Sequence, residues 1–91
     1  MNIKRTRYAA VRNNKTEVLI DVSNGPNYGQ TRQEWIDTHW RNINNVGQAR
    51  ILTWVTKNKA IAALMKSAYT ENVEYEIVPV VETLEFSEDK I

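Results

Sequence analysis

The sequence contains no cysteine, only three glycines and two prolines, and a single histidine among its 91 residues. Without thiols, disulfide bonds and thiolate metal sites are excluded, and a zinc site would need His39 with carboxylates alone. No apolar stretch reaches the roughly 18 residues that a membrane span needs, and the basic first residues lack the apolar segment of a signal peptide. We therefore expect a cytoplasmic protein without membrane contact, metal or cofactor.

Catalytic motifs are missing as well. Ser23 and Asp21 flank a loop, but no nucleophile elbow surrounds them. The stretch "NGPNYGQTR" places glycines before a helix, as an anion cradle does, yet it lacks the Gly-Lys-Ser/Thr of a phosphate loop. A small-ligand site in the Gly25–Gly29 loop is therefore the most distant function considered, and the sequence predicts that the protein is not an enzyme.

What is present is the composition of a small globular domain. Hydrophobic residues make up 42% of the chain and charged residues 25%, which is typical of a folded protein and not of a disordered one. Residues 1–91 are long enough for one modest core. We expect a single domain whose last residues, 87–91, form a disordered tail.

The first third of the chain has the pattern of a β-hairpin. In "RYAAVRNNKTEVLIDVS", two nearly alternating runs flank residues 13–16, where asparagine tolerates the positive φ that tight turns require. Val18, Ile20 and Val22 share one face of the second run, and Leu19 lies on the other.

Two helices follow, each with a start signal. Residues 31–34, "TRQE", have the spacing of a capping box, and the stripe of Ile36, Trp40 and Ile43 extends the first helix toward Gly47. Residues 49–55 alternate and favour a strand, after which Thr56 is a suitable cap for a second amphipathic helix.

The chain closes with the strand pattern "VEYEIVPVVETLEF", in which Pro79 indicates a sheet edge, a bulge or two short strands. The expected element order is β-β-α-β-α-β, an α+β fold with a single four-stranded mixed sheet and two helices packed on one face. The expected core consists of Val18, Ile20, Val22, Ile36, Trp40, Ile43, Ile51, Val55, Ile61, Leu64, Met65, Tyr75 and Ile77.

The assignment of side chains to the two faces of the sheet then predicts a binding surface. If Ile51 and Val55 face the helices, the reverse of the sheet lies open, and an open apolar face usually marks an interface. The residues expected on that face are Arg50, Leu52 and Trp54, together with Leu19 and Tyr8. Two alternatives remain open: a bulge near Gly47 would turn Trp54 inward, or the acidic C-terminal tail would cover the face.

The charge is unevenly distributed. Residues 1–70 hold 11 Lys/Arg and 4 Asp/Glu, whereas residues 71–91 hold 7 Asp/Glu and one lysine. One interpretation is that the first and last strands lie side by side and neutralise each other. The other is an anionic partner, RNA or single-stranded DNA, bound by a basic hairpin that contains Tyr8 and the cations Lys4, Arg5, Arg7, Arg12 and Lys15. Against nucleic acid stand a net charge of only +1 and the absence of an aromatic-rich signature strand.

The rhythm "YAAV…W…GQARILTWVTKNKAIAAL", from Tyr8 to Leu64, resembles the N-terminal hybrid-binding module of eukaryotic-type ribonuclease H. The sequence departs from that module in the loop of the second strand and in carrying Ile-Leu-Thr where the module has basic and aromatic residues, so no binding site is carried over. The chain also looks like the small accessory proteins of lytic phages, which are compact, rich in Asn and Lys, and free of cysteine and catalytic motifs. That resemblance implies a role in host takeover or anti-defence.

The function expected from the sequence is therefore that of a non-enzymatic binding or inhibitor protein. It would occlude the functional surface of a host or defence-system protein through the open sheet face, or pair that face with a second copy as a homodimer. The alternative is RNA or single-stranded nucleic-acid binding by the basic hairpin.

Overall fold

The computed structural model describes residues 2–21, 25 and 27–85. The predicted tail, residues 87–91, and the predicted core residue Val22 lie outside these residues. The described chain forms an α+β fold with one antiparallel sheet of five strands and two helices. The elements are β1 (Asn2–Arg12), β2 (Glu17–Asp21), α1 (Arg32–Asp37), β3 (Trp40–Asn42), β4 (Arg50–Ile51), α2 (Lys57–Met65) and β5 (Glu76–Glu85), with 3-10 turns η1 (Ile43–Asn45) and η2 (Ala68–Thr70).

The α+β class is confirmed, but the prediction of four strands in a mixed sheet is wrong. The strands follow the order β3-β2-β1-β5, β4 pairs with β2 beside this path, and every pairing is antiparallel. The additional strand arises because α1 ends at Asp37, capped by Thr38, so that Trp40 pairs with Leu19 instead of continuing the helix. Ile36, Trp40 and Ile43, which have helical spacing in the sequence, therefore lie in a helix, a strand and a 3-10 turn.

Local start signals are confirmed where one side chain decides them. The Thr31 hydroxyl accepts a hydrogen bond from the Glu34 backbone N–H at 3.1 Å, and the Glu34 carboxylate accepts one from the Thr31 N–H, which completes the capping box. The hydrogen bond from the Thr31 backbone to the Glu34 carboxylate, and after it the interaction of that carboxylate with the Thr31 side chain, lower the pKa of Glu34. Thr56 caps α2 in the same way through the Lys59 N–H. The hairpin turn has φ of +53°, +58° and +66° at Asn13, Asn14 and Lys15.

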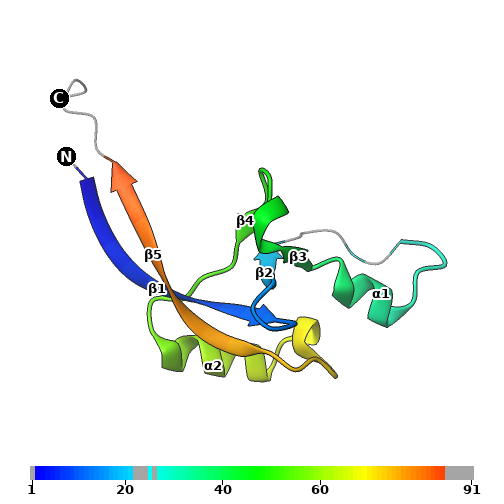
Figure 1. Cartoon of the computed structure of the whole chain (residues 1–91). Helices are drawn as coiled ribbons and strands as arrows, with labels where there is room; N and C mark the ends of the chain where they lie inside the picture. The colour runs from blue at the N-terminus through cyan, green and yellow to red at the C-terminus, as the bar shows by residue number, and fades with distance from the viewer. Residues whose placement is uncertain (1, 22–24, 26, 86–91) are drawn as a thin grey trace.

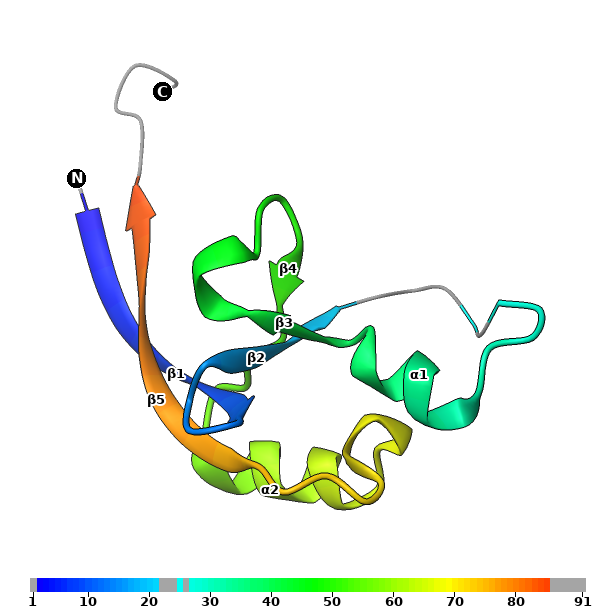
Figure 2. The ribbon, with the colours of Figure 1, turned by 45° about the vertical axis from the view of Figure 1, so that its right-hand side comes forward.

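A long two-stranded ribbon dominates the shape (Figure 1). β1 and β5 pair over ten positions, from Asn2 opposite Glu85 to Val11 opposite Glu76. β1 pairs with β2 only at Val11 and Arg12, and a single bridge joins Tyr8 to Trp54. The distal part of the ribbon, residues 2–7 with residues 80–85, therefore extends from the body as an arm (Figures 1 and 2).

Pro79 lies in the edge strand, one of the three positions that the sequence allowed. It stands opposite Tyr8, whose backbone N–H and C=O exchange bonds of 2.9 and 2.8 Å with Trp54 on the other side. In an antiparallel ladder, a residue that bonds to one neighbour forms a non-hydrogen-bonded pair with the other. The missing N–H of proline therefore leaves no gap in the ladder.

Two buried clusters lie on the two faces of the sheet. The helix-side cluster joins Ile36 of α1 and Leu64 of α2 to Ala10, Leu19 and Trp40. The cluster on the reverse consists of Ala9, Val11, Val18 and Ile20, packed against β5 and against Val46 and Ala49 from the segment that leads into β4. No described helix contributes to this second cluster.

The predicted sidedness is wrong, and the register of the strands explains how. Ile20 pairs with Ile51, so these two side chains share a face, as the sequence indicated. The helices, however, cover the opposite face, where Leu52 and Trp54 pack against the cluster of Leu19. Only residues 50–51 form a strand instead of 49–55, because the chain then crosses from β2 to β1.

The predicted core is confirmed in part. Val18, Ile20, Ile36, Trp40 and Leu64 are buried as predicted, and Tyr75 and Ile77 pack against the core. Five predicted core residues are instead exposed: Ile43 by 48%, Ile51 by 36%, Val55 by 57%, Ile61 by 39% and Met65 by 77%.

Candidate functional site

The reverse face of the sheet carries a groove of about 530 Å³ beside the arm. β1 and β5 form one wall, and η1 and β4 with the following segment form the other. The lining residues are Arg5, Arg7, Val11, Val18, Ile43, Arg50, Ile51, Thr53, Val78, Val80, Val81 and Glu82. We call this surface the arginine groove.

Apolar side chains remain accessible in and around this groove. Val11 and Val18 are 2% and 3% exposed and belong to the buried cluster beneath it. Ile43 and Ile51 are 48% and 36% exposed, because neither of the two described α-helices covers this face. A concave surface with accessible aliphatic side chains beside charged ones has the composition of an interaction site.

Two guanidinium groups lie against one carboxylate in the arginine groove, and the charge of a third, that of Arg50, also acts on it. Arg5 donates to both oxygens of Glu82, from Nε to Oε2 at 3.3 Å and from Nη2 to Oε1 at 3.2 Å. Arg7 donates to the Thr53 Oγ1 at 2.7 Å and to the Thr53 carbonyl at 3.1 Å, and its Nε lies 3.6 Å from Glu82 Oε2. These bonds fix the Arg7 side chain against the segment after β4.

The field in this groove is positive. The hydrogen bonds from Arg5, followed by the charges of Arg5, Arg7 and Arg50, lower the pKa of Glu82, although partial desolvation opposes the shift. Arg50 is exposed and lies opposite Asp21 in the β2–β4 register, and its side chain makes no hydrogen bond and no ion pair within 4.0 Å among the described residues. Among the lining residues, one carboxylate thus stands against three guanidinium groups, a formal surplus of two positive charges, while Asp21 lies opposite Arg50 outside the lining.

The predicted partner-binding residues are not brought together. Only Arg50 lines the arginine groove. Leu19 is fully buried under the helices, and Leu52 and Trp54 are partly buried against the same cluster. Tyr8 lies two positions before Ala10 in β1, so its side chain is on the same face, where it is half-buried. The expected open face of Tyr8, Leu19, Leu52 and Trp54 is therefore wrong, and the alternative with Trp54 turned inward is the observed one.

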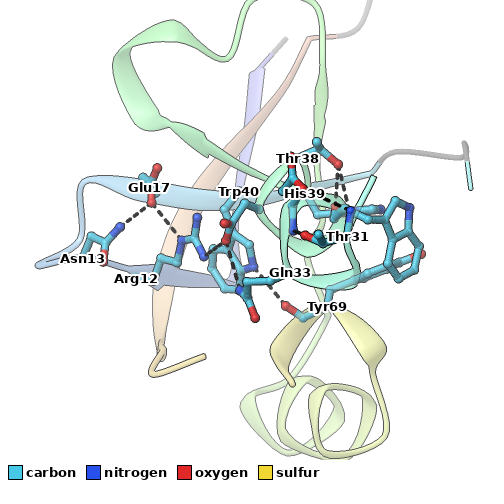
Figure 3. Close-up of polar contacts among 12 residues, drawn as sticks. Arg12, Asn13, Glu17, Thr31, Gln33, Thr38, His39, Trp40 and Tyr69 are labelled. Carbon is cyan, nitrogen blue, oxygen red and sulfur yellow. Dashed lines mark hydrogen bonds and ion pairs between the residues drawn. The ribbon is translucent and has the colours of Figure 1, made fainter. Parts of the chain in front are cut away.

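The five predicted basic residues do not form one surface either. Arg5 and Arg7 lie in the arginine groove, whereas Lys4 projects from the opposite side of the arm, since neighbours in a strand alternate. At the other end of the ribbon, Arg12 bonds to Glu17 at 2.8 Å and Asp37 at 2.9 Å and lies over the Trp40 ring (Figure 3). Lys15 lies 4.0 Å from Glu76.

The interpretation that the first and last strands neutralise each other is confirmed. β1 and β5 are neighbours throughout, and Arg5, Arg7 and Lys15 form ion pairs with β5 carboxylates. The uneven charge along the sequence is thus largely balanced within the folded ribbon. The exception is the arginine groove.

His39 is fully buried in an aromatic cluster. Its ring stacks on Tyr69 at a centroid distance of 4.0 Å and meets Trp35 edge-on at 5.0 Å. Its Nδ1 lies 2.9 Å from the Trp35 carbonyl, and its Nε2 has no hydrogen-bond partner among the described residues (Figure 3). In the described part of the chain, no three His, Asp or Glu residues gather where they could hold a metal ion.

Comparisons of the chain with protein-family models, curated proteins and solved structures find no match. In the residues that the structure describes, neither helix is long and apolar enough to cross a membrane. Thr53, Val80 and Glu82 are groove residues that the sequence analysis missed. The alternation of Val80, Glu82 and Leu84 along the last strand could have indicated Val80 and Glu82, had the pairing with β1 been known, whereas no sequence signal indicated Thr53.

Proposed function

We propose that the chain is a non-enzymatic binding protein that occludes the functional surface of a partner protein through the arginine groove. The observation that carries the proposal is the combination of accessible aliphatic side chains with a surplus of positive charge in one concavity, on the sheet face that the described helices leave free. Arginine concentrates binding energy in interfaces more than most residue types do.

The chemistry of the arginine groove fits an acidic, partly apolar segment. Guanidinium groups pair with carboxylates in bidentate geometry, and the exposed Arg50 side chain is available for such a pair because it makes no hydrogen bond among the described residues. Ile43 and Ile51 offer apolar contact at the same wall. A partner segment with Asp or Glu next to aliphatic or aromatic side chains would satisfy both features.

A displayed library of random peptides tests this proposal without knowledge of the natural partner. The library is selected on the immobilised wild-type protein, and single enriched peptides are then measured by fluorescence anisotropy. We expect enrichment of peptides that combine Asp/Glu with aliphatic or aromatic residues. Arg50→Glu should weaken their binding about tenfold or more, since it cancels the charge surplus.

Lys59→Glu is the matched control, because it makes the same change of charge at an exposed position of α2, outside the groove lining. It should leave the peptide affinity unchanged. Enrichment without acidic residues, or equal losses in Arg50→Glu and Lys59→Glu, would contradict the proposal.

The positive surplus also keeps nucleic acid as a second candidate. A fluorescent single-stranded RNA in the same assay distinguishes the two, since phosphate binding weakens steeply with salt. RNA binding that exceeds peptide binding, falls with salt and is lost in Arg50→Glu would favour the alternative. The role as a phage accessory protein acting on a host or defence-system protein stays a prediction.

A further inference from the structure

The outer edge of β5 offers unpaired backbone groups to a neighbour. Because Tyr8 and Pro79 form a non-hydrogen-bonded pair, the residues of β5 that alternate with Val80 and Glu82 direct their N–H and C=O away from β1. These are Ile77, Val81 and Thr83, with Pro79 contributing only its carbonyl. β5 is the terminal strand of the sheet, and no described strand pairs with this edge.

This edge carries few of the features that protect sheet edges from pairing. Such features are lysines, prolines, bulges and short strand length. β5 is ten residues long, contains no lysine, and pairs with β1 in continuous register without a bulge. Pro79 is its one proline, and its charged residues are Glu76, Glu82 and Glu85. In its middle, the Val81 side chain is 70% exposed.

We propose that a second copy of this chain pairs with this edge, β5 against β5, about a two-fold axis at Val81. In this antiparallel register Val81 lies opposite Val81 of the second copy, so two exposed apolar side chains cover each other. Val80 then lies opposite Glu82, and Val78 opposite Leu84. No two carboxylates face each other directly, and each Glu82 keeps its pair with Arg5 of its own chain.

Pro79 costs this register one hydrogen bond on each side of the axis. It lies opposite Thr83 of the second copy, where its carbonyl still accepts a bond and only its missing N–H leaves one unmade. This occurs once on each side of the axis. A register with like charges opposed would be disfavoured, and a two-fold pairing closes on itself instead of extending into a fibre.

The dimer would present two binding surfaces on one side. The two-fold axis of an antiparallel strand pair is perpendicular to the sheet, so β1-β5-β5-β1 becomes one continuous ribbon with both reverse faces on the same side. The two arginine grooves then lie side by side and would bind a partner with two acidic segments more tightly than one groove does. The pairing itself does not depend on what the grooves bind.

Single cysteines test the register, because the native sequence contains none. Opposed Cα atoms in a hydrogen-bonded antiparallel pair are about 5.5 Å apart, within the range of a disulfide. We expect Val81→Cys to give a disulfide-linked dimer under mild oxidation, seen by non-reducing electrophoresis.

Two further variants control this result. Thr83→Cys should not crosslink, since the two copies of this residue lie four positions apart along the strands, about 14 Å. Met65→Cys, 77% exposed on α2, reports random collision. Crosslinking at position 83 or 65 that equals crosslinking at position 81 would overturn the proposal.

Sedimentation equilibrium tests the association itself. The wild type should shift with concentration from 10.6 kDa to twice this mass. Val81→Pro, which removes an outward N–H at an edge that already tolerates a proline, should stay at 10.6 kDa. Val81→Thr keeps that N–H and should dimerise with only slightly lower affinity, while circular dichroism verifies that all variants fold.

A wild type that remains a monomer up to about 1 mM, beyond the weakest specific complexes, would overturn the proposal. So would a dimer that survives Val81→Pro. A dimer lost in Arg50→Glu but retained in Val81→Pro would show that two copies meet through their grooves instead.

Discussion

Leu19 and Leu64, on the helix side of the sheet, are 0% and 1% exposed, whereas Ile43 and Ile51, on the reverse side, are 48% and 36% exposed. All four are large aliphatic residues, so hydrophobicity does not decide which of them are buried. Burial is decided by the segments that cover each face. Two helices lie over one face, and the short segment between β3 and β4 covers only part of the other. The first face is therefore buried under the helices, whereas the second combines a buried cluster with apolar surface that is left for binding.

The arginines differ in how fully their side chains are engaged, since Arg5 and Arg7 in the groove also have partners. On the helix side and at the hairpin, arginines are engaged: Arg12 bonds to two carboxylates and lies over Trp40. On the reverse side, Arg50 has no such partner in the described chain and adds to the positive field at Glu82. A surface that holds both uncovered aliphatic groups and an uncompensated cation is the better candidate for recognition.

The largest difference between the faces is expected in a pair of alanine variants. Leu19→Ala removes a fully buried side chain from the helix-side cluster and should lower the free energy of unfolding by about 3 kcal/mol. Ile51→Ala removes a side chain of similar size at the rim of the arginine groove and should cost less than about 1 kcal/mol. Urea titration followed by tryptophan fluorescence measures both.

Equal losses in these two variants would contradict the division of the faces. A larger loss for Ile51→Ala would restore the sidedness expected from the sequence, with Ile51 under the helices. The peptide assay provides an independent reading, because only Ile51→Ala should also weaken binding in the arginine groove.

Trp54→Ala gives the next largest effect and separates folding from recognition at one residue. The indole is partly buried against the helix-side cluster, so its removal should lower the free energy of unfolding by about 2 kcal/mol. Because Trp54 does not line the groove, the affinity for selected peptides should stay unchanged at a temperature where the variant is folded. Loss of binding with unchanged stability would place the indole on the recognition surface after all.

The sequence was sufficient wherever a single residue and its neighbours decide the structure. Thr31 and Thr56 accept hydrogen bonds from backbone N–H groups three residues later, and the turn at Asn13 and Asn14 needs only their tolerance of positive φ. Because it lacks a donor, Pro79 limited the last element to an edge, a bulge or two short strands, and the structure shows the edge. Each of these interactions spans a few residues, and its signal is therefore local.

Sidedness could not be predicted because it depends on which distant segment covers a strand. In β2, Val18, Leu19 and Ile20 are all buried, so both faces of this strand are covered and the alternation of side chains does not distinguish them. The grouping of Leu19 with Leu52 and Trp54 was correct, but the side on which the helices lie was not. The connection through Gly47, with φ of +63°, and the crossing of residues 52–54 from β2 to β1 decide it.

Of the residues predicted to bind a partner protein, only Arg50 lines the candidate groove, for a related reason. The other wall depends on the register between the two ends of the chain, which places Arg5 opposite Glu82 and Arg7 opposite Val80. These pairs are separated by more than seventy positions in the sequence. Composition indicated that the ends of the chain attract each other, but it did not indicate which basic residues would keep surplus charge.

The smallest expected effect concerns the pH dependence of the arm. The bonds from Arg5 and the nearby arginine charges lower the pKa of Glu82 in the folded protein, so its carboxylate stabilises the arm at pH values above its ordinary pKa of 4.5. This contribution is lost as the pH falls through the lowered folded value. The urea midpoint of the wild type should therefore slightly exceed that of Glu82→Gln at pH 7, and the two should converge near pH 3.

In an Arg5→Gln background the difference between the two midpoints at pH 7 should shrink, because the first cause of the pKa shift is gone. A difference that persists at pH 3, or is unchanged without Arg5, would mean that packing of the Glu82 side chain, and not its charge, holds the two strands of the arm together.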